Sequence, residues 1–166
     1  MPVIALAHGG GTPQLVNEPA GPYWLSVWTT PDPARVGEFH LTLGLSEPGE
    51  GREAGAPVLG ANMQVRLEPA TATTGSPVTA MATNENSTNK LFYEADVTIP
   101  AEGTWQVQIQ VDGPAGLGAA SFPLEVGPPQ TTNWLLLGGG GVLLVVALFA
   151  FLSWRRKTQT SAQTNR

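Results

Sequence analysis

The chain has 166 residues, two histidines and no cysteine, and its formal net charge is −5. Without cysteine it can form no disulfide, thiol nucleophile or zinc–cysteine site. All thirteen acidic residues precede Asn133, together with only four basic ones. A segment this acidic repels phosphate backbones, which argues against a nucleic acid as partner.

The first residues resemble the end of a secretion signal. Ala5-Leu6-Ala7 fits the small-x-small pattern that signal peptidase recognises, although too few residues precede it for a full signal peptide. We therefore expect residues 1–7 to be a signal-peptide remnant, with the natural start further upstream. Cleavage after Ala7 would leave His8 as the first residue of the mature chain, followed by a flexible N-terminal segment over 8–19.

Residues 20–127 show the pattern of an all-β domain. Apolar and polar residues alternate with period two in seven short segments, which is typical of half-buried strands, and Gly, Pro and polar loops separate them. This spacing predicts an immunoglobulin-like antiparallel β-sandwich of about seven strands. Trp105 is expected to be the largest core residue. The other side chains expected to face inward are Phe39, Leu41, Leu43, Val65, Leu67, Tyr93, Val97, Val107 and Ile109.

A membrane anchor is predicted after this domain. A Pro-rich stalk over 128–133 precedes an uncharged stretch, 134–154, that begins and ends with tryptophan. Twenty-one helical residues span about 30 Å, the thickness of the bilayer's hydrocarbon core. The basic tail, 155–166, then places the C-terminus in the cytoplasm by the positive-inside rule. We thus expect a single-pass protein of the cell membrane, anchored in lipid, with its β-domain extracytoplasmic.

Short motifs within the β-domain resemble a known family. They are Gly21-Pro22-Tyr23, Val36-Gly37, Tyr93-Glu94-Ala95, Gly103-Thr104-Trp105 and Val111-Asp112-Gly113. Over residues 20–127 the chain resembles the YtkA-like family, small extracytoplasmic β-sandwiches related in style to CopC-like copper-resistance proteins. The resemblance implies copper handling at the outer face of a bacterial membrane, in the service of a membrane protein complex.

Few side chains could bind such a metal. Copper(II) favours imidazole and amine nitrogen, and copper(I) accepts thioether sulfur. The candidate ligands are His8, whose free α-amine and imidazole would chelate together as in CopC-like proteins, His40 and Met81. Met63 falls in the apolar register and is expected in the core. For each histidine, a solvated surface side chain is the alternative interpretation.

No enzyme is indicated, because the sequence lacks a nucleophile elbow, a Walker A loop, a His-Glu-x-x-His motif and a dinucleotide fingerprint. Glu94 and Asp96 share one strand face, where they could bind calcium or simply be solvated. Two functional classes remain open. One is a copper-binding accessory protein or chaperone for a membrane metalloprotein. The other is a metal-free interaction module, docking through exposed aromatics such as Trp24 and Trp28.

Overall fold

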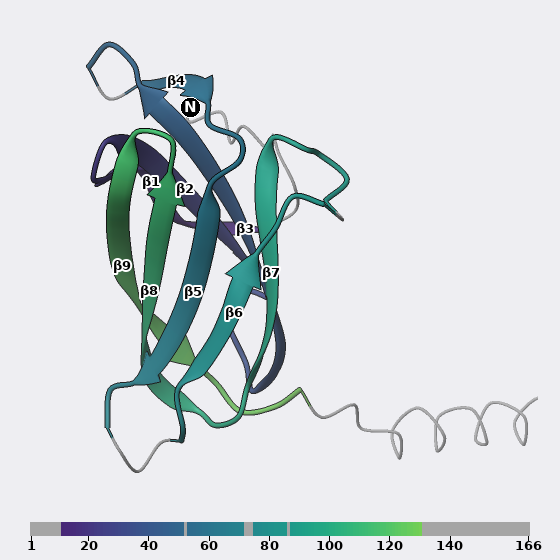
Figure 1. Cartoon of the computed structure of the whole chain (residues 1–166). Coiled ribbons are helices and arrows are strands. Elements are labelled where there is room, and N and C mark those ends of the chain that lie inside the picture. The colour runs from purple at the N-terminus through teal and green to yellow at the C-terminus, as the bar shows by residue number, and fades with distance from the viewer. Residues whose placement is uncertain (1–10, 52, 72–74, 86, 131–166) are drawn as a thin grey trace, which may run out of the picture. The chain divides into compact units, whose positions relative to one another are not determined.

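The computed structural model describes residues 11–51, 53–71, 75–85 and 87–130 (Figure 1). These residues form nine strands in two antiparallel sheets. In the five-stranded sheet, the order β1-β2-β3-β4 is extended by β7, which pairs with β3. Its strands are β1 (Thr12–Ala20), β2 (Tyr23–Thr30), β3 (Gly37–Pro48), β4 (Ala54–Pro57) and β7 (Phe92–Ile99). The four-stranded sheet has the order β6-β5-β8-β9, with β5 (Asn62–Pro69), β6 (Val78–Ala82), β8 (Gly103–Gly113) and β9 (Gly116–Val126).

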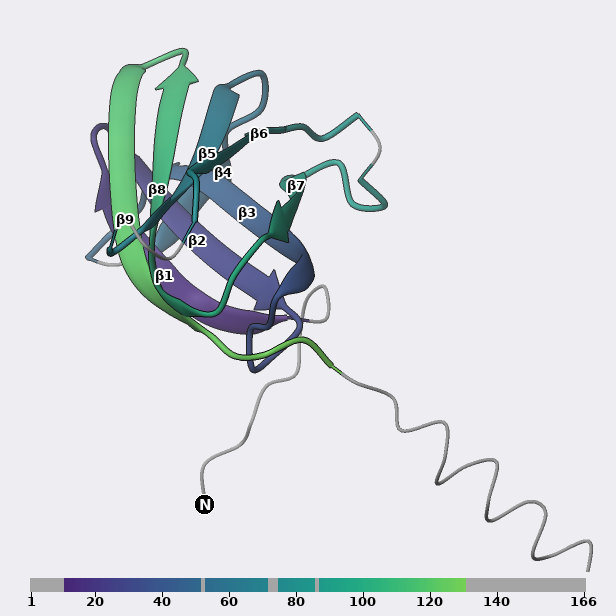
Figure 2. The same ribbon diagram turned by 90° about the horizontal axis from the view of Figure 1, so that it is seen from below.

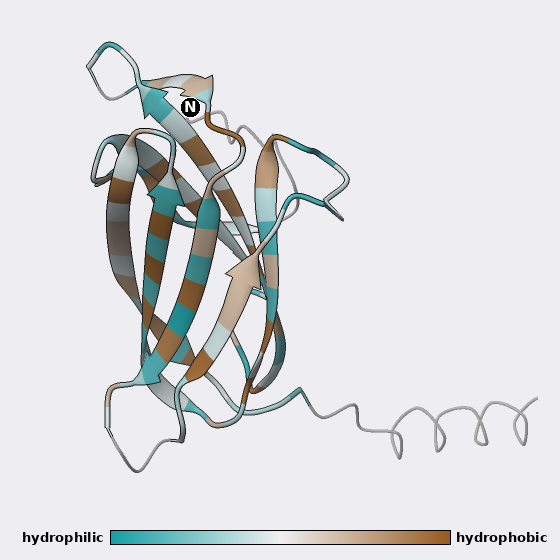
Figure 3. Ribbon diagram, in the orientation of Figure 1, coloured by the Kyte–Doolittle hydropathy of each residue, from teal (hydrophilic) through white to brown (hydrophobic). Residues whose placement is uncertain are grey.

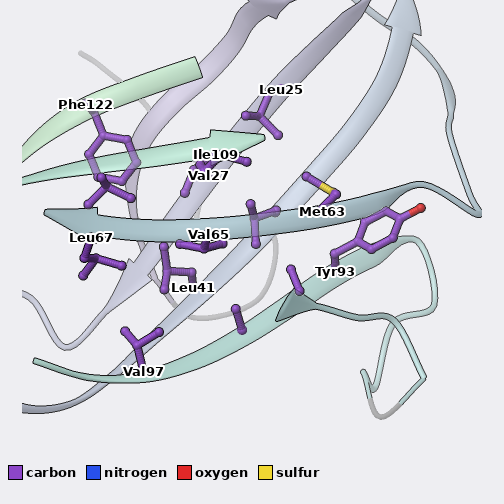
Figure 4. Close-up of a cluster of buried hydrophobic side chains, with 14 of the residues drawn as sticks. Leu25, Val27, Leu41, Met63, Val65, Leu67, Tyr93, Val97, Ile109 and Phe122 are labelled. Carbon is purple, nitrogen blue, oxygen red and sulfur yellow. The ribbon is translucent and has the colours of Figure 1, made fainter. Parts of the chain in front are cut away.

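The core lies between the two sheets because successive side chains along a strand point to opposite faces. Figure 3 shows the resulting alternation of apolar and polar residues along β5 and β8. Side chains from both sheets, among them Leu25, Leu41 and Val65, fill the interior (Figure 4). All ten residues predicted to face inward are buried, and Trp105 is the largest fully buried side chain. The prediction of a β-sandwich with this core is confirmed.

Buried aromatic rings with polar atoms are satisfied by backbone groups. The Trp105 indole Nε1 donates to the carbonyl of Ala101 at 3.0 Å. The Tyr93 hydroxyl accepts the Ala61 amide at 3.0 Å. In the same way, the Tyr23 hydroxyl accepts an amide from the β8–β9 turn at 2.8 Å. These bonds hold the loops against the core, because an unpaired buried polar atom would cost free energy.

The β-domain begins earlier in the chain than residue 20, the start predicted from the sequence, because it includes strand β1. We expected a flexible segment over 8–19, whereas Thr12–Ala20 forms an edge strand paired with β2. Two register shifts interrupt this pairing, and only Ala20 of the strand is fully buried. The apolar alternation that marks the other strands is therefore missing. The short strand β4, exposed along its whole length, is the second addition to the seven predicted strands.

The chain ends of the described part lie near the connection between β2 and β3. Gly127 donates its amide to the carbonyl of Ala34 at 2.9 Å, and its own carbonyl accepts the amide of Val36 at 3.0 Å. Figure 2 shows the segment after β9 passing this connection as it leaves the sandwich. The described residues between 11 and 130 belong to one compact unit.

The predicted membrane anchor lies outside the part of the chain that the structure describes. The same is true of the signal-peptide remnant 1–7, residues 131–133 of the stalk and the tail 155–166. Among the described residues, no helix is long and apolar enough to cross a bilayer. The anchor and the topology it implies therefore stay predictions.

Candidate functional site

His40 lies on the outer face of the five-stranded sheet and contacts a carboxylate. It is directly opposite Asp96 in the β3–β7 register, and its Nδ1 is 2.7 Å from the Asp96 Oδ1. Because an ionised carboxylate only accepts hydrogen bonds, Nδ1 carries the proton and donates it. The other ring nitrogen, Nε2, is 3.3 Å from the Thr42 hydroxyl. The carboxylate thus selects the tautomer in which Nε2 is unprotonated, and the lone pair of Nε2 accepts a hydrogen bond from the Thr42 hydroxyl.

The His40–Asp96 pair borders a shallow hollow of about 640 Å³, where β2 ends and β3 begins, beside the last residues of β7. Thr30, Pro31, Glu38 and Thr98 line it together with His40 and Asp96. Glu38 and Asp96 contribute two exposed carboxylates. No lysine or arginine lines the hollow, so its two carboxylates favour a cation over an anion.

The N-terminal end of the described chain lies beside this hollow. A Cβ added to Gly11 would approach the Thr30 hydroxyl oxygen to 3.2 Å and the Thr29 carbonyl oxygen to 3.1 Å. Thr30, in turn, is the β2 partner of His40. Gly11 and His40 therefore lie at the same end of the sheet, on either side of Thr30. His8, the other predicted ligand, lies outside the described residues.

Met81 is not near His40. It lies on β6, opposite Gln64 in the four-stranded sheet, and 55% of its surface is exposed. Because Met81 is exposed, its thioether lies on the outer face of the four-stranded sheet. His40, by contrast, lies on the outer face of the five-stranded sheet. The structure thus separates two of the predicted ligands by the thickness of the sandwich. Met63 is completely buried in the core, as expected.

The two carboxylates of β7 have different partners. Asp96 contacts His40, whereas Glu94 accepts the Ser87 hydroxyl at 2.9 Å. In the neighbouring loop, the Lys90 ammonium donates to the backbone carbonyl of Glu85 at 2.5 Å. In the part of the chain that the structure describes, no three His, Cys, Asp or Glu side chains group as a metal site. A complete copper site would thus need a ligand from elsewhere.

The two tryptophans expected to be exposed are half-buried instead. Trp28 packs edge-on against Phe92 of β7, with ring centroids 5.7 Å apart and an interplanar angle of 82°. Both rings lie over Gly44, where an added Cβ would come within 3.5 Å of either one. The Nε1 of Trp24 is buried and has no hydrogen-bond partner among the described residues. These aromatics cover the outer face of the sheet, so only part of each ring is available to a partner.

Sequence reasoning did not connect Asp96 with His40, since it considered Asp96 only together with Glu94, as a calcium ligand or a solvated side chain. The sequence placed both His40 and Asp96 in the polar register of their strands, but 56 residues separate them. Only the antiparallel pairing of β3 with β7 makes them neighbours. A prediction of that strand pair would have found the contact.

No family model matches the chain, and no curated protein and no solved structure is similar enough to be matched to it. The resemblance to the YtkA-like family therefore stays a prediction.

Proposed function

We propose that the protein is a membrane-anchored extracytoplasmic β-sandwich that binds one copper ion through His8 and His40, as an accessory or chaperone for a membrane metalloprotein. One observation carries this proposal. An imidazole held by a carboxylate at 2.7 Å lies in an acidic hollow, at the end of the sheet that Gly11 adjoins.

The role of Asp96 follows from the chemistry of histidine ligands. A metal-binding histidine usually donates its other ring N–H to a carboxylate, which fixes the tautomer and raises the basicity of the ligating nitrogen. Asp96 accepts the Nδ1 proton of His40, so Nε2 would be the ligand. Asp96 is then a positioning residue, and the neighbouring Glu38 adds negative charge to the hollow that the copper ion would enter.

His8 would supply the remaining nitrogen ligands. It precedes Gly11 by three residues, and three extended residues span at most about 10 Å. This reach suits a site at His40, because a Cβ at Gly11 would lie 3.2 Å from the hydroxyl of Thr30, the strand partner of that histidine. A free α-amine and the imidazole of the same residue can chelate copper(II) together. Met81, on the other face, has no part in this site.

Two forms of the full chain in nanodiscs test the proposal. One begins at His8, and the other keeps residues 1–7 ahead of it. We expect calorimetry to show tighter copper(II) binding by the form with the free amine, and binding should weaken with acid because both nitrogens must be unprotonated. Equal affinity would exclude the N-terminal chelate, and an absence of binding would exclude the copper function altogether.

The half-buried aromatic cluster favours a second candidate, a metal-free interaction module. Trp24, Trp28 and Phe92 place partly exposed rings on one outer face, and aromatic rings are enriched where proteins bind one another. A photo-crosslinking residue at Trp24 should then capture a discrete membrane partner in cells. The same residue at Gln106, on the opposite sheet, serves as the control. Equal capture at both positions would count against docking through the aromatic face.

A further inference from the structure

A second hollow lies on the outer face of the four-stranded sheet, away from the histidine. It measures about 670 Å³. Its floor crosses the strands in register, since Gln64 is opposite Met81 on one side and Gln110 on the other, and Gln110 is opposite Ala119. The next row places Asp112 between Asn62 and Leu117. The proposed copper site is not part of this surface.

The walls of this hollow are apolar and rise from its two sides. Met81 on β6 and Leu117 on β9 are 55% and 75% exposed, which is unusual for large apolar side chains. On β9, two residues after Leu117, the small side chain of Ala119 ends the row that begins at Met81. Two exposed apolar walls facing one hollow indicate a ligand that offers apolar surface to both.

The floor carries carboxamides that the protein does not use. The side chains of Asn62, Gln64 and Gln110 make no hydrogen bond to another described residue. By contrast, the nearby Gln108 donates to Glu68 at 3.4 Å. Each free carboxamide offers two donor hydrogens and an acceptor oxygen. The hollow can therefore give and receive hydrogen bonds at several neighbouring points.

The charge of the hollow narrows the class of ligand. Asp112 is the one charged residue among those that line it. With no basic group the hollow does not favour an anion, and a single carboxylate is too few ligands for a metal ion such as calcium. A neutral molecule with many hydroxyl groups and apolar C–H faces matches both the carboxamides and the walls.

We propose that this hollow binds a neutral oligosaccharide. Paired residues on adjacent strands lie about 5 Å apart, so Gln64 and Gln110 are spaced to contact the hydroxyl groups of one sugar ring. Met81 and Leu117 would then pack against the C–H faces of that ring and its neighbour. An extended peptide would use the backbone of a strand edge instead, whereas the free polar groups here lie on the face of the sheet.

The full chain in nanodiscs, free of sugar-based detergent, provides the test. Cellohexaose, chitohexaose and maltohexaose serve as neutral probes, and an uncharged hexapeptide of Gly, Ser and Asn serves as the competing class. We expect at least one hexasaccharide to bind in calorimetry and to shift the side-chain amide signals of Gln64 and Gln110 in NMR spectra. Binding of the peptide alone, or of none of the four, would overturn the proposal.

Variants of the surface locate the site. The double variant Gln64→Ala/Gln110→Ala should weaken saccharide binding at least tenfold, and Ala119→Phe, which fills the hollow, should do the same. Gln106→Ala is the matched control, because Gln106 lies on the outer face of β8 beyond the residues that line the hollow, and it should bind as the unaltered chain does. Unchanged affinity in both hollow variants would overturn the assignment of the site.

Discussion

The two outer faces of the sandwich have opposite chemical characters. The five-stranded sheet presents the His40–Asp96 pair, the carboxylate of Glu38 and the Trp28–Phe92 ring pair. The hollow on the four-stranded sheet presents unpartnered carboxamides beside two exposed apolar side chains, and Asp112 is the one carboxylate that lines it. The two faces differ although they share one core, because successive side chains along each strand point to opposite sides of its sheet.

The largest expected effect comes from the core that the faces share. Trp105→Ala should lower the free energy of unfolding by about 3–5 kcal/mol, because it removes a fully buried indole and leaves a cavity. Urea denaturation followed by circular dichroism measures this loss. Both faces should lose ligand binding in proportion to the unfolded fraction. A loss of ligand binding at one face alone would show that the two faces do not depend equally on the core.

A smaller effect is expected where the two sheets meet at β9. A Cβ added to Gly118 would overlap the Ala20 carbonyl oxygen, so Gly118→Ala must push β9 away from the β1–β2 turn. Such overpacking typically costs about 1–3 kcal/mol, which thermal melting would detect. Gly116→Ala is no control because of its positive φ, whereas Ala119→Ser changes the exposed face nearby and should be neutral. Equal melting temperatures for Gly118→Ala and Ala119→Ser would contradict the close contact.

The smallest effect concerns the ring pair on the outer face. A double-mutant cycle with Trp28→Ala and Phe92→Ala should give a coupling free energy of about 0.5–1.5 kcal/mol, as expected for edge-to-face rings. Urea unfolding of the four proteins measures it. Additive effects of the two substitutions would mean that the rings contribute separately, by covering Gly44.

Much of the fold could be predicted from the sequence because a strand with one buried face has apolar residues at every second position. Seven strands and the ten inward residues follow from that alternation. Strand β1 does not show it, since edge position and two register shifts leave only Ala20 buried. Strand β4 buries none of its residues, so it carries no pattern at all.

The candidate site could be predicted only in part. His40 was found because histidine is rare in this chain and its register is polar. Its contact with Asp96, and its separation from Met81, depend on which strands pair and in which sheet. The alternation of apolar and polar residues along one strand does not show which strands lie beside it. The sequence therefore could not show whether His40 and Met81 lie on the same face of the sandwich.

The most direct measurement compares the copper(II) affinities of two variants, each of which alters a candidate ligand on a different face of the sandwich. His40→Gln and Met81→Leu are made in the full chain that begins at His8 and are titrated by calorimetry in nanodiscs. We expect His40→Gln to weaken binding at least tenfold and Met81→Leu to leave it unchanged, because His40 lies at the end of the sheet that Gly11 adjoins and Met81 lies on the other sheet. Unchanged affinity in His40→Gln, or a loss in Met81→Leu, would contradict the account.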